Sequence, residues 1–387
     1  QQAILDLGSI SLGQGSEPLL SEGTLDFTLD DRYPLAGAKL LIQDLWYTAE
    51  IWLDEVFLGT VTGGSFPGEF ELGDRLRPGP HRLGIRVRSP GKKSGLLLGA
   101  RKEADYLKAS VGTLQLHLAP AVHIDWFALP FSQGKVQAQA SVPEAPDGSR
   151  VRFEAALDGE VLQRLGEAPV VDGIARADPV HWEGELWSSK TGASALYQFT
   201  ATLLDAQGEQ LDRRPARSGL RATRHSEEAC FLNGEPTTVL AGRMEESWKT
   251  EGAQLNELLQ AGVNSIEIHG SYPPPILLSL SDEAGIHMVV LPRCDGEARA
   301  SLQELLDQKE KLHQQQQALA VATLHHPSLM FWSMEGGPEL KQGLRSSFES
   351  DPLSRLVAGG NIPATSLSAR KQNKLQNLEA GTWITEI

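Results

Sequence analysis

Three glutamates follow strand-like segments in the second half of the chain, where they could transfer protons. Glu335 and Glu339 come after the continuous apolar run Ser328–Ser333, and Glu386 ends a short segment close to the end of the sequence. A run without alternation is typical of a strand buried on both faces, as in a parallel sheet or an α/β barrel. Polar residues just past such strands lie where barrel enzymes carry out their chemistry. We therefore take these glutamates as candidate catalytic residues; the simpler interpretation is a core strand and its loop.

The segment around the apolar run resembles the fourth-strand signature of family 2 glycoside hydrolases, the group of β-galactosidases, β-glucuronidases and β-mannosidases. In that family an N-H-P-S start leads into W-S-x-G-N-E, whose Glu is the general acid/base. Here the start reads His326-Pro327-Ser328, and Trp332-Ser333-Met334 is followed by Glu335 and two glycines. The family's acid position is therefore Gly337, which cannot carry a proton. Glu335 and Glu339 are each displaced from it by two residues.

The resemblance also implies a nucleophile, because retaining hydrolysis of a glycoside uses two carboxyl groups about 5–5.5 Å apart. In the family this is a Glu that ends a later barrel strand, in an I-x-T-E-type sequence. Trp383-Ile384-Thr385-Glu386 is similar to that ending, which makes Glu386 the candidate. Few residues separate Gly360 from Thr382, so a polar end to a terminal strand is the alternative interpretation.

Other positions that line the family's sugar pocket also differ. After the second barrel strand the family has V-R-x-S-H-Y-P, whose Arg helps to position the nucleophile. Here the Arg position is Glu267, while the Tyr of that motif is kept as Tyr272. We expect any remaining saccharide contacts to involve Trp332, His269 and Tyr272. The acid pair Asp282-Glu283 is interpreted as solvated surface.

From Cys230 onward, strand-like and helix-like segments alternate, which predicts parallel strands joined by right-handed crossovers. The strands are expected at Asn264–Ile268, His287–Leu291, Ser328–Ser333 and Arg355–Gly359, and the helices at Glu251–Gln260, Pro275–Ala284, Ser301–Thr323 and Glu339–Phe348. A closed barrel needs about eight strands and typically about 250 residues, more than this part of the chain provides. The sequence therefore predicts an incomplete TIM-type (β/α) barrel in residues 223–387. We expect other protein chains, the residues after Asn361 or further sequence to complete or cover it.

Two β-rich domains are predicted ahead of the barrel. Residues 1–119 contain short alternating runs separated by Gly and Pro, which indicate a jelly-roll-like β-sandwich. Within them, Ala49–Leu53 alternates so that Ile51 and Leu53 share one face, and Asp54-Glu55 then forms a hairpin turn. This block resembles the family's sugar-binding jelly roll, which usually has Asn-Gly in that turn.

Residues 120–222 are expected to form an immunoglobulin-like β-sandwich. Strands are predicted at Arg150–Leu157, Leu196–Leu204 and Trp182–Trp187. The aromatic residues Trp182, Trp187 and Tyr197 are interpreted as core or interdomain side chains, because burial is the commoner fate of large rings.

The amino-acid composition limits the classes of partner that we expect. Hydrophobic residues make up 40% of the chain and charged residues 22%, as in ordinary globular proteins. The net charge of −15 disfavours nucleic acid and anionic membranes. No apolar segment reaches the roughly 20 residues of a membrane span. The start at Gln1 is consistent with processing or trimming, so an extracytoplasmic location, periplasmic or secreted, is favoured and a cytoplasmic one stays open. Two cysteines make no disulfide framework, and no motif for a metal or cofactor is present.

Two functions of different classes follow. The first is a non-catalytic relative of family 2 glycoside hydrolases, a structural or interaction subunit of a larger protein complex that retains some carbohydrate binding. The second is a retaining exo-β-glycosidase that hydrolyses terminal β-linked sugars, with Glu335 or Glu339 as acid and Glu386 as nucleophile.

Overall fold

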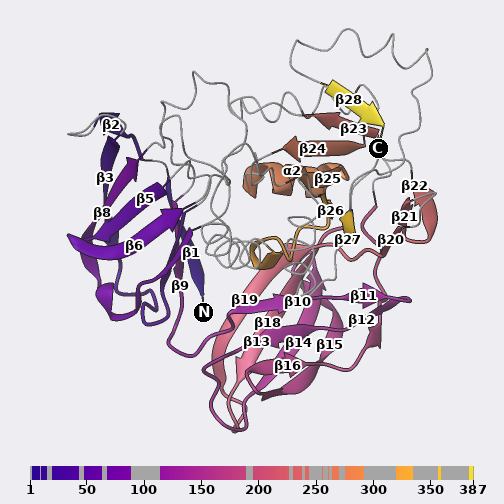
Figure 1. Ribbon diagram of the computed structural model, residues 1–387. Helices are drawn as coiled ribbons and strands as arrows, with labels where there is room; N and C mark the ends of the chain where they lie inside the picture. Colours follow the sequence, from indigo (N-terminus) through magenta and orange to yellow (C-terminus); the bar gives the residue numbers. More distant parts are fainter. Residues whose placement is uncertain are drawn as a thin grey trace, which may run out of the picture.

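The computed structural model describes residues 2–8, 10–14, 20–42, 48–62, 68–88, 114–188, 195–225, 230–237, 240–243, 264–269, 275–291, 320–333, 356–358 and 383–386, with Leu255 and Gln260. Within these residues the protein consists mostly of β-sheets with few helices, and its last part contains a curled sheet of the half-barrel type (Figure 1). None of the described helices is long and apolar enough to cross a membrane. The domain boundaries after residues 119 and 222 stay predictions.

The described strands up to residue 118 form two antiparallel sheets around a common core (Figure 1). The first has the order β1 (Ala3–Gly8), β9 (Leu114–Leu118), β4 (Lys39–Ile42) and β7 (Gly68–Glu71); the second has the order β2 (Gly13–Gln14), β3 (Leu20–Leu29), β8 (Gly79–Arg88), β5 (Thr48–Leu53) and β6 (Val56–Thr62). The predicted alternation in β5 is confirmed, since Ile51 and Leu53 are buried and Trp52 is only half-buried. A 3₁₀ turn, Gly73–Arg75, connects β7 to β8.

The hairpin between β5 and β6 turns at Asp54 and Glu55, as predicted. Both residues have positive φ angles, 49° for Asp54 and 68° for Glu55, as a type I′ turn requires. Asp54 is held there by its carboxylate, which accepts hydrogen bonds from the Arg82 backbone N–H at 2.8 Å and from His81 Nδ1 at 2.6 Å. These contacts replace the conformational freedom that Gly would supply.

The described residues between 126 and 218 form a second β-sandwich with its own core. Its larger sheet has the order β10 (Trp126–Ala128), β13 (Gln139–Ser141), β16 (Ile174–Arg176), β15 (Glu160–Val171), β14 (Arg150–Leu157), β18 (Tyr197–Leu204) and β19 (Gln210–Ser218); a smaller sheet contains β11 (Phe131–Ser132), β12 (Lys135–Val136) and β17 (Val180–His181). The larger sheet curls because β15 pairs with β14 along most of its length and with β16 at its end. Phe127, Phe153 and Phe199 are fully buried between the layers.

The prediction of a strand at Trp182–Trp187 is wrong, because β17 ends at His181. The segment is fixed by other contacts: the Tyr197 hydroxyl accepts from the Glu185 N–H at 2.7 Å, and Gly184 packs closely against the Trp182 ring. The aromatic interpretation is confirmed. Trp187 and Tyr197 are buried, and Trp182 lies edge-on to Tyr197 with 4.9 Å between ring centroids.

Polar contacts join the first two sandwiches. Lys39 Nζ lies 3.0 Å from Asp125 Oδ1, and Gln2 donates to Asp212 Oδ2 at 2.7 Å. Burial alone would lower the pKa of Lys39, but the carboxylates of Glu69 and Asp125 outweigh it and raise that pKa above its usual value. These contacts come from residues far apart in the sequence, so they fix the two sandwiches against each other.

A curled sheet of six described strands follows a small sheet formed by β20 (Thr223–His225), β21 (Cys230–Leu232) and β22 (Glu235–Thr237). Its order is β27 (Leu356–Ala358), β26 (Leu329–Ser333), β25 (His287–Leu291), β24 (Ser265–His269), β23 (Leu240–Arg243) and β28 (Trp383–Glu386). The strands β23 to β27 are parallel, as the alternating pattern predicts. β28 runs antiparallel to β23, so it adds a strand to the sheet without continuing the parallel order.

Helix α2 (Pro275–Ala284) has the predicted bounds. Pro275 suits the first helical position, where its missing N–H costs nothing. Gly285, with φ of 70°, ends the helix, and the Ile286 N–H bonds to the Ser281 carbonyl at 3.0 Å, as in a Schellman motif. The predicted helices at Glu251–Gln260, Ser301–Thr323 and Glu339–Phe348 lie wholly or mostly outside the described residues.

Candidate functional site

The carboxyl ends of the parallel strands meet at one edge of the curled sheet, where the family would place its chemistry. His269 ends β24 and is aligned with Leu291, and Ser333 ends β26 and is aligned with Ala358. Trp332 is aligned with Val290 on the neighbouring strand. The structure therefore brings two of the predicted saccharide contacts, His269 and Trp332, to the same edge.

The remaining candidates at this edge lie outside the described residues: Tyr272, Glu335, Gly337 and Glu339. Glu267, the position of the family's Arg, lies within β24, where it is aligned with Arg243 of β23. Saccharide contact at this edge stays a prediction.

Glu386 lies at the opposite edge of the sheet. Because β28 is antiparallel, Glu386 is aligned with Leu240, the first residue of β23. Ala241 is aligned with Ser265, so the residue of β24 beside Leu240 and Glu386 is Asn264. His269 lies five residues further along β24. At a rise of about 3.3 Å per residue, this is about 16 Å along the strands. The register thus separates Glu386 from the carboxyl edge by about three times the distance that retaining hydrolysis needs.

The amino edge of the same sheet is tied to the second sandwich. Trp187 donates its indole N–H to the main-chain oxygen of Asp282 at 2.8 Å, and Arg217 lies 2.5 Å from Glu283. Arg221 donates to the carbonyl oxygens of Pro327 and Leu329 at the start of β26. These contacts come from β19 and the segments around it, so they fix the barrel sheet on the sandwich.

Asp282 is the centre of this contact region. Its carboxylate accepts from the Ser328 backbone N–H at 3.0 Å and from His326 Nδ1 at 2.7 Å. Asp282 is only 5% exposed, so its interpretation as solvated surface is wrong. A sequence signal existed: Leu278 and Asp282 are four residues apart on α2, which places both on its buried face. Glu283 is exposed, as predicted.

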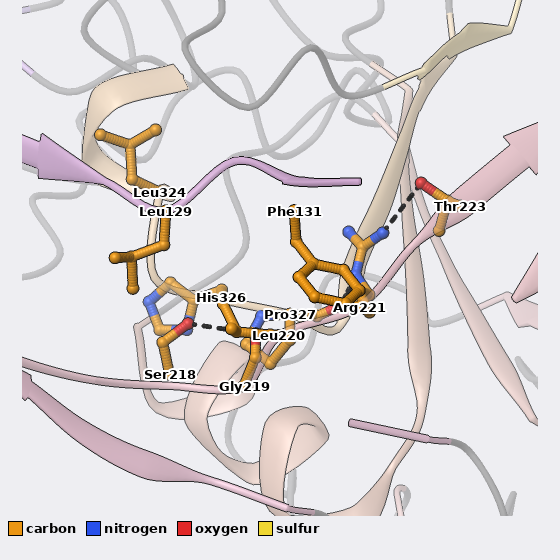
Figure 2. Close-up of a pocket in the computed structure, with 10 residues that line it drawn as sticks. All are labelled: Leu129, Phe131, Ser218, Gly219, Leu220, Arg221, Thr223, Leu324, His326 and Pro327. Atoms are coloured by element: carbon orange, nitrogen blue, oxygen red, sulfur yellow. Dashed lines mark hydrogen bonds between the residues drawn. The ribbon is translucent and has the colours of Figure 1, made fainter. Parts of the chain in front are cut away.

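A cavity of about 210 Å³ is lined in part by His326, the hydrogen-bond partner of Asp282 (Figure 2). It is lined by Leu129, Phe131, Ser218, Gly219, Leu220, Arg221, Thr223, Leu324, His326 and Pro327. Figure 2 shows the Arg221 guanidinium at one end and the His326 ring at the other. The cavity therefore lies at the amino edge, away from the carboxyl edge where the family places its chemistry.

The groups of the cavity do not assemble into a nucleophile and base. His326 is oriented by Asp282, but the Ser218 hydroxyl makes its hydrogen bond with the Gly219 carbonyl, at 3.5 Å. The Arg221 guanidinium donates to backbone oxygens and to Thr223 Oγ1. Among the described residues, no group of three or more His, Cys, Asp and Glu is arranged to hold a metal ion. These contacts hold the barrel sheet against the second sandwich.

His287, the first residue of β25, is fully buried in this contact region. Its ring lies edge-on to Trp187, with 5.5 Å between ring centroids. Within the described part of the chain, neither ring nitrogen has a hydrogen-bond partner. Burial and, next, the charge of Arg221 lower the pKa of His287 to about 3. His287 is therefore neutral in the folded protein at physiological pH.

Known sequences resemble the chain over most of its length. No model of a protein family matches it. It is 24% identical over 391 residues to a β-galactosidase of Enterobacter cloacae, an alignment that covers 89% of this chain and 36% of that protein. A β-galactosidase of Alteromonas mediterranea is 22% identical over 269 residues, covering 62% of this chain and 25% of the relative. The chain thus spans only about a third or less of the length of these curated relatives.

Solved structures share the fold. A β-glucuronidase from Ruminococcus gnavus in complex with an N1-substituted uronic isofagomine has a TM-score of 0.71 at 13% identity, covering 92% of this chain and 73% of that chain. A GH2 β-galacturonidase from Eisenbergiella tayi bound to galacturonate has a TM-score of 0.69 at 18% identity, covering 90% and 69%. In sequence and in fold, the chain resembles family 2 glycoside hydrolases, and its shortened barrel is consistent with the partial coverage of these longer proteins.

Proposed function

We propose that this chain is a non-catalytic member of the glycoside hydrolase-like group, which acts as a structural or interaction subunit of a larger assembly. The observation that carries the proposal is Gly337, which occupies the position of the family's general acid/base. Hydrolysis of a β-glycoside needs a proton donor for the leaving oxygen, and a glycine has none.

The register of β28 supports the proposal. Glu386 is the one candidate for the nucleophile, and its backbone is aligned with Leu240 at the amino edge of the sheet. A nucleophile must face the acid across the sugar at about 5–5.5 Å. The carboxyl edge, which contains His269 and Trp332, is the expected place of any remaining saccharide binding.

The partner is proposed to be a protein that covers the barrel sheet beyond β27. β27 is the last strand of the described sheet on that side, and a parallel edge strand presents unpaired backbone groups that favour pairing with another chain. Among the described residues, β20 also lies against β27, so the partner is expected to cover the rest of this side.

Turnover of aryl β-galactosides, β-glucuronides and β-galacturonides by the purified chain tests the proposal. We expect no hydrolysis above that of a Glu386→Gln variant. Substantial hydrolysis that Glu386→Gln abolishes would instead establish the second function, a retaining exo-β-glycosidase. Hydrolysis that survives Glu386→Gln but is lost in Glu335→Gln or Glu339→Gln would also contradict the proposal, with a different nucleophile.

A further inference from the structure

The outer face of the second sandwich carries arginines on both sides of a central strand. Arg152 of β14 is aligned with Thr202 of β18, which is aligned in turn with Arg213 of β19. Directly opposite residues of an antiparallel pair have their side chains on the same face of the sheet. The inward residues of β14 and β18 belong to the core, so this row points outward. The four strands lie side by side in the order β15, β14, β18 and β19 (Figure 1).

Two more arginines lie on the same face. Arg150 is two residues before Arg152 on β14, and Arg164 of β15 is aligned with Glu154, so both point outward. We call Arg150, Arg152, Arg164 and Arg213 the arginine face. Arg213 is exposed and makes no ion pair with any other described residue.

Glu167 organises two of these arginines. Its Oε2 accepts from Arg152 Nε at 2.9 Å, and its Oε1 lies 2.9 Å from Arg150 Nε, a contact not aligned as a hydrogen bond. Both guanidiniums are thus held through the Nε edge. Guanidiniums bind oxyanions through forked pairs of N–H groups, and the contacts with Glu167 use the Nε atoms.

A break in the ladder opens a hollow among these side chains. The register between β14 and β15 shifts at Phe153 and Glu154, opposite Gly166, whose φ is 107°. A β-bulge of this kind re-aims neighbouring side chains. The hollow has a volume of about 370 Å³ and is lined by Arg152, Arg164, Gly166 and Glu167.

The charge of the face is opposite to that of the chain. The protein has a net charge of −15, yet the arginine face brings four guanidiniums together with two carboxylates, those of Glu154 and Glu167. A cationic surface on an acidic protein concentrates anions locally. Arg217 lies four residues after Arg213 on the same face of β19 and contacts Glu283 of α2. The barrel contact therefore adjoins one end of this face and involves none of its four arginines.

We propose that the arginine face binds the carboxylate groups of an acidic polysaccharide. Planar guanidiniums recognise carboxylates, and the Thr202 hydroxyl between Arg152 and Arg213 offers a neutral partner for sugar hydroxyls. The aligned rows contain no aromatic ring on which a base could stack. They also lack the aromatic and Met side chains typical of the cores of protein interfaces. The site does not depend on the barrel and holds whether or not the barrel hydrolyses anything.

Binding of an oligogalacturonate to the full chain, measured by calorimetry at low salt, tests the proposal. The test variant is Arg152→Gln/Arg213→Gln. The control is Arg32→Gln/Arg82→Gln, which removes the same charge from exposed arginines of the first sandwich. We expect the test variant to weaken binding about tenfold or more, because two charge-assisted contacts are lost. The control should bind within about twofold of the parent, and a neutral galactan oligosaccharide should not bind.

Three outcomes would overturn the proposal. They are the absence of oligogalacturonate binding to the parent, an equal loss of binding in both double variants, and equally tight binding of a polyglutamate peptide, which would assign the face to acidic protein segments. If the test variant has an altered thermal midpoint, Arg164→Gln replaces it, since that side chain is 82% exposed and makes only a 3.6 Å contact with Glu154. Turnover of aryl glycosides is a separate measurement, so failure here leaves the barrel proposal untouched.

Discussion

The indole N–H of Trp187 donates to the main-chain oxygen of Asp282, with 2.8 Å between the two atoms. The carboxylate of the same Asp282 binds His326 and the backbone of Ser328. One residue of α2 is therefore bonded both to the second sandwich and to the loop that leads into β26. Contacts at the amino edge of a barrel sheet serve stability, so we expect the bonds of Asp282 to contribute to the free energy of unfolding.

Trp187→Phe should lower the free energy of unfolding by about 1–3 kcal/mol. The substitution leaves the Asp282 oxygen without its donor and opens a small cavity at a fully buried position. Trp182→Phe is the control, because the Trp182 indole bonds to the Glu185 oxygen at 3.2 Å in an exposed region. Urea unfolding followed by circular dichroism measures both. Equal losses in the two variants would contradict a special role for the interdomain bond.

Asp282→Ala should cost about 2–4 kcal/mol, because it leaves a buried N–H of Ser328 and the His326 ring without their acceptor. Its neighbour provides a matched control. Glu283→Gln removes an exposed ion pair with Arg217, which should change stability by less than about 1 kcal/mol. Thermal unfolding of the two variants should therefore differ clearly, and a loss for Glu283→Gln as large as that for Asp282→Ala would count against the burial argument.

Strands with a clear apolar pattern, alternating or continuous, were predictable from the sequence. β5, β14 and β18 have alternating or continuous apolar patterns and were predicted close to their observed bounds. β15 and β19 were not identified. β19 reads QLDRRPARS, with a Pro and three Arg, because it lies at the edge of its sheet and its outer face is charged. Edge strands of this composition resemble loops when periodicity is the only guide.

The likeness to family 2 glycoside hydrolases was predictable from the motif around Trp332, whereas the loss of the acid at Gly337 stays a prediction. The direction of β28 was not predictable, because a short apolar segment can pair either way and only its neighbour in space decides. The buried state of Asp282 depends on His326 and Ser328, more than forty residues later in the chain. Sequence reasoning has no access to such a contact without the fold.

Glu55→Gly should stabilise the protein by about 0.5–1 kcal/mol. Glu55 has a φ of 68°, a conformation that Gly adopts without strain. Asp54→Gly is the informative comparison, since Asp54 also has positive φ but its carboxylate accepts from Arg82 and His81. That variant should destabilise the protein. Thermal midpoints measured side by side decide the matter, and a gain for both variants would show that the hydrogen bonds of Asp54 contribute little.

Acid should destabilise the protein through His287, which is buried, and His117, which is half-buried. Burial and the charge of Arg221 lower the pKa of His287 to about 3, and burial and the charge of Arg214 lower that of His117 to about 4. In the unfolded chain both should titrate near 6.5. Below that pH both histidines are protonated in the unfolded state but stay neutral in the folded state. Their contribution to the free energy of unfolding is therefore fully present above about pH 6.5 and is lost as the pH falls towards 3–4. At pH 5 the loss should be about 2 kcal/mol for each histidine.

Urea unfolding at pH 7 and pH 5 measures this loss. His287→Gln should reduce the difference between the two pH values, because its side chain does not titrate. His181→Gln serves as the control, since His181 is exposed, and it should leave the difference unchanged. An unchanged difference in His287→Gln would mean that the ring is solvated in the folded protein.

Restoring the missing acid alone should not create a glycosidase. Gly337→Glu supplies a carboxyl group where the family carries its acid, yet Glu386 is aligned with Leu240 at the other edge, about 16 Å along the strands from the row of His269. Retaining hydrolysis needs about 5–5.5 Å between the two groups, so we expect turnover of aryl β-glycosides to stay at the level of Gly337→Ala. The prediction would be contradicted if Gly337→Glu gained turnover and lost it again when Glu386→Gln was added. Two carboxylates act as a pair only when one sugar ring separates them, so that result would place Glu386 at the carboxyl edge of the sheet and not beside Leu240.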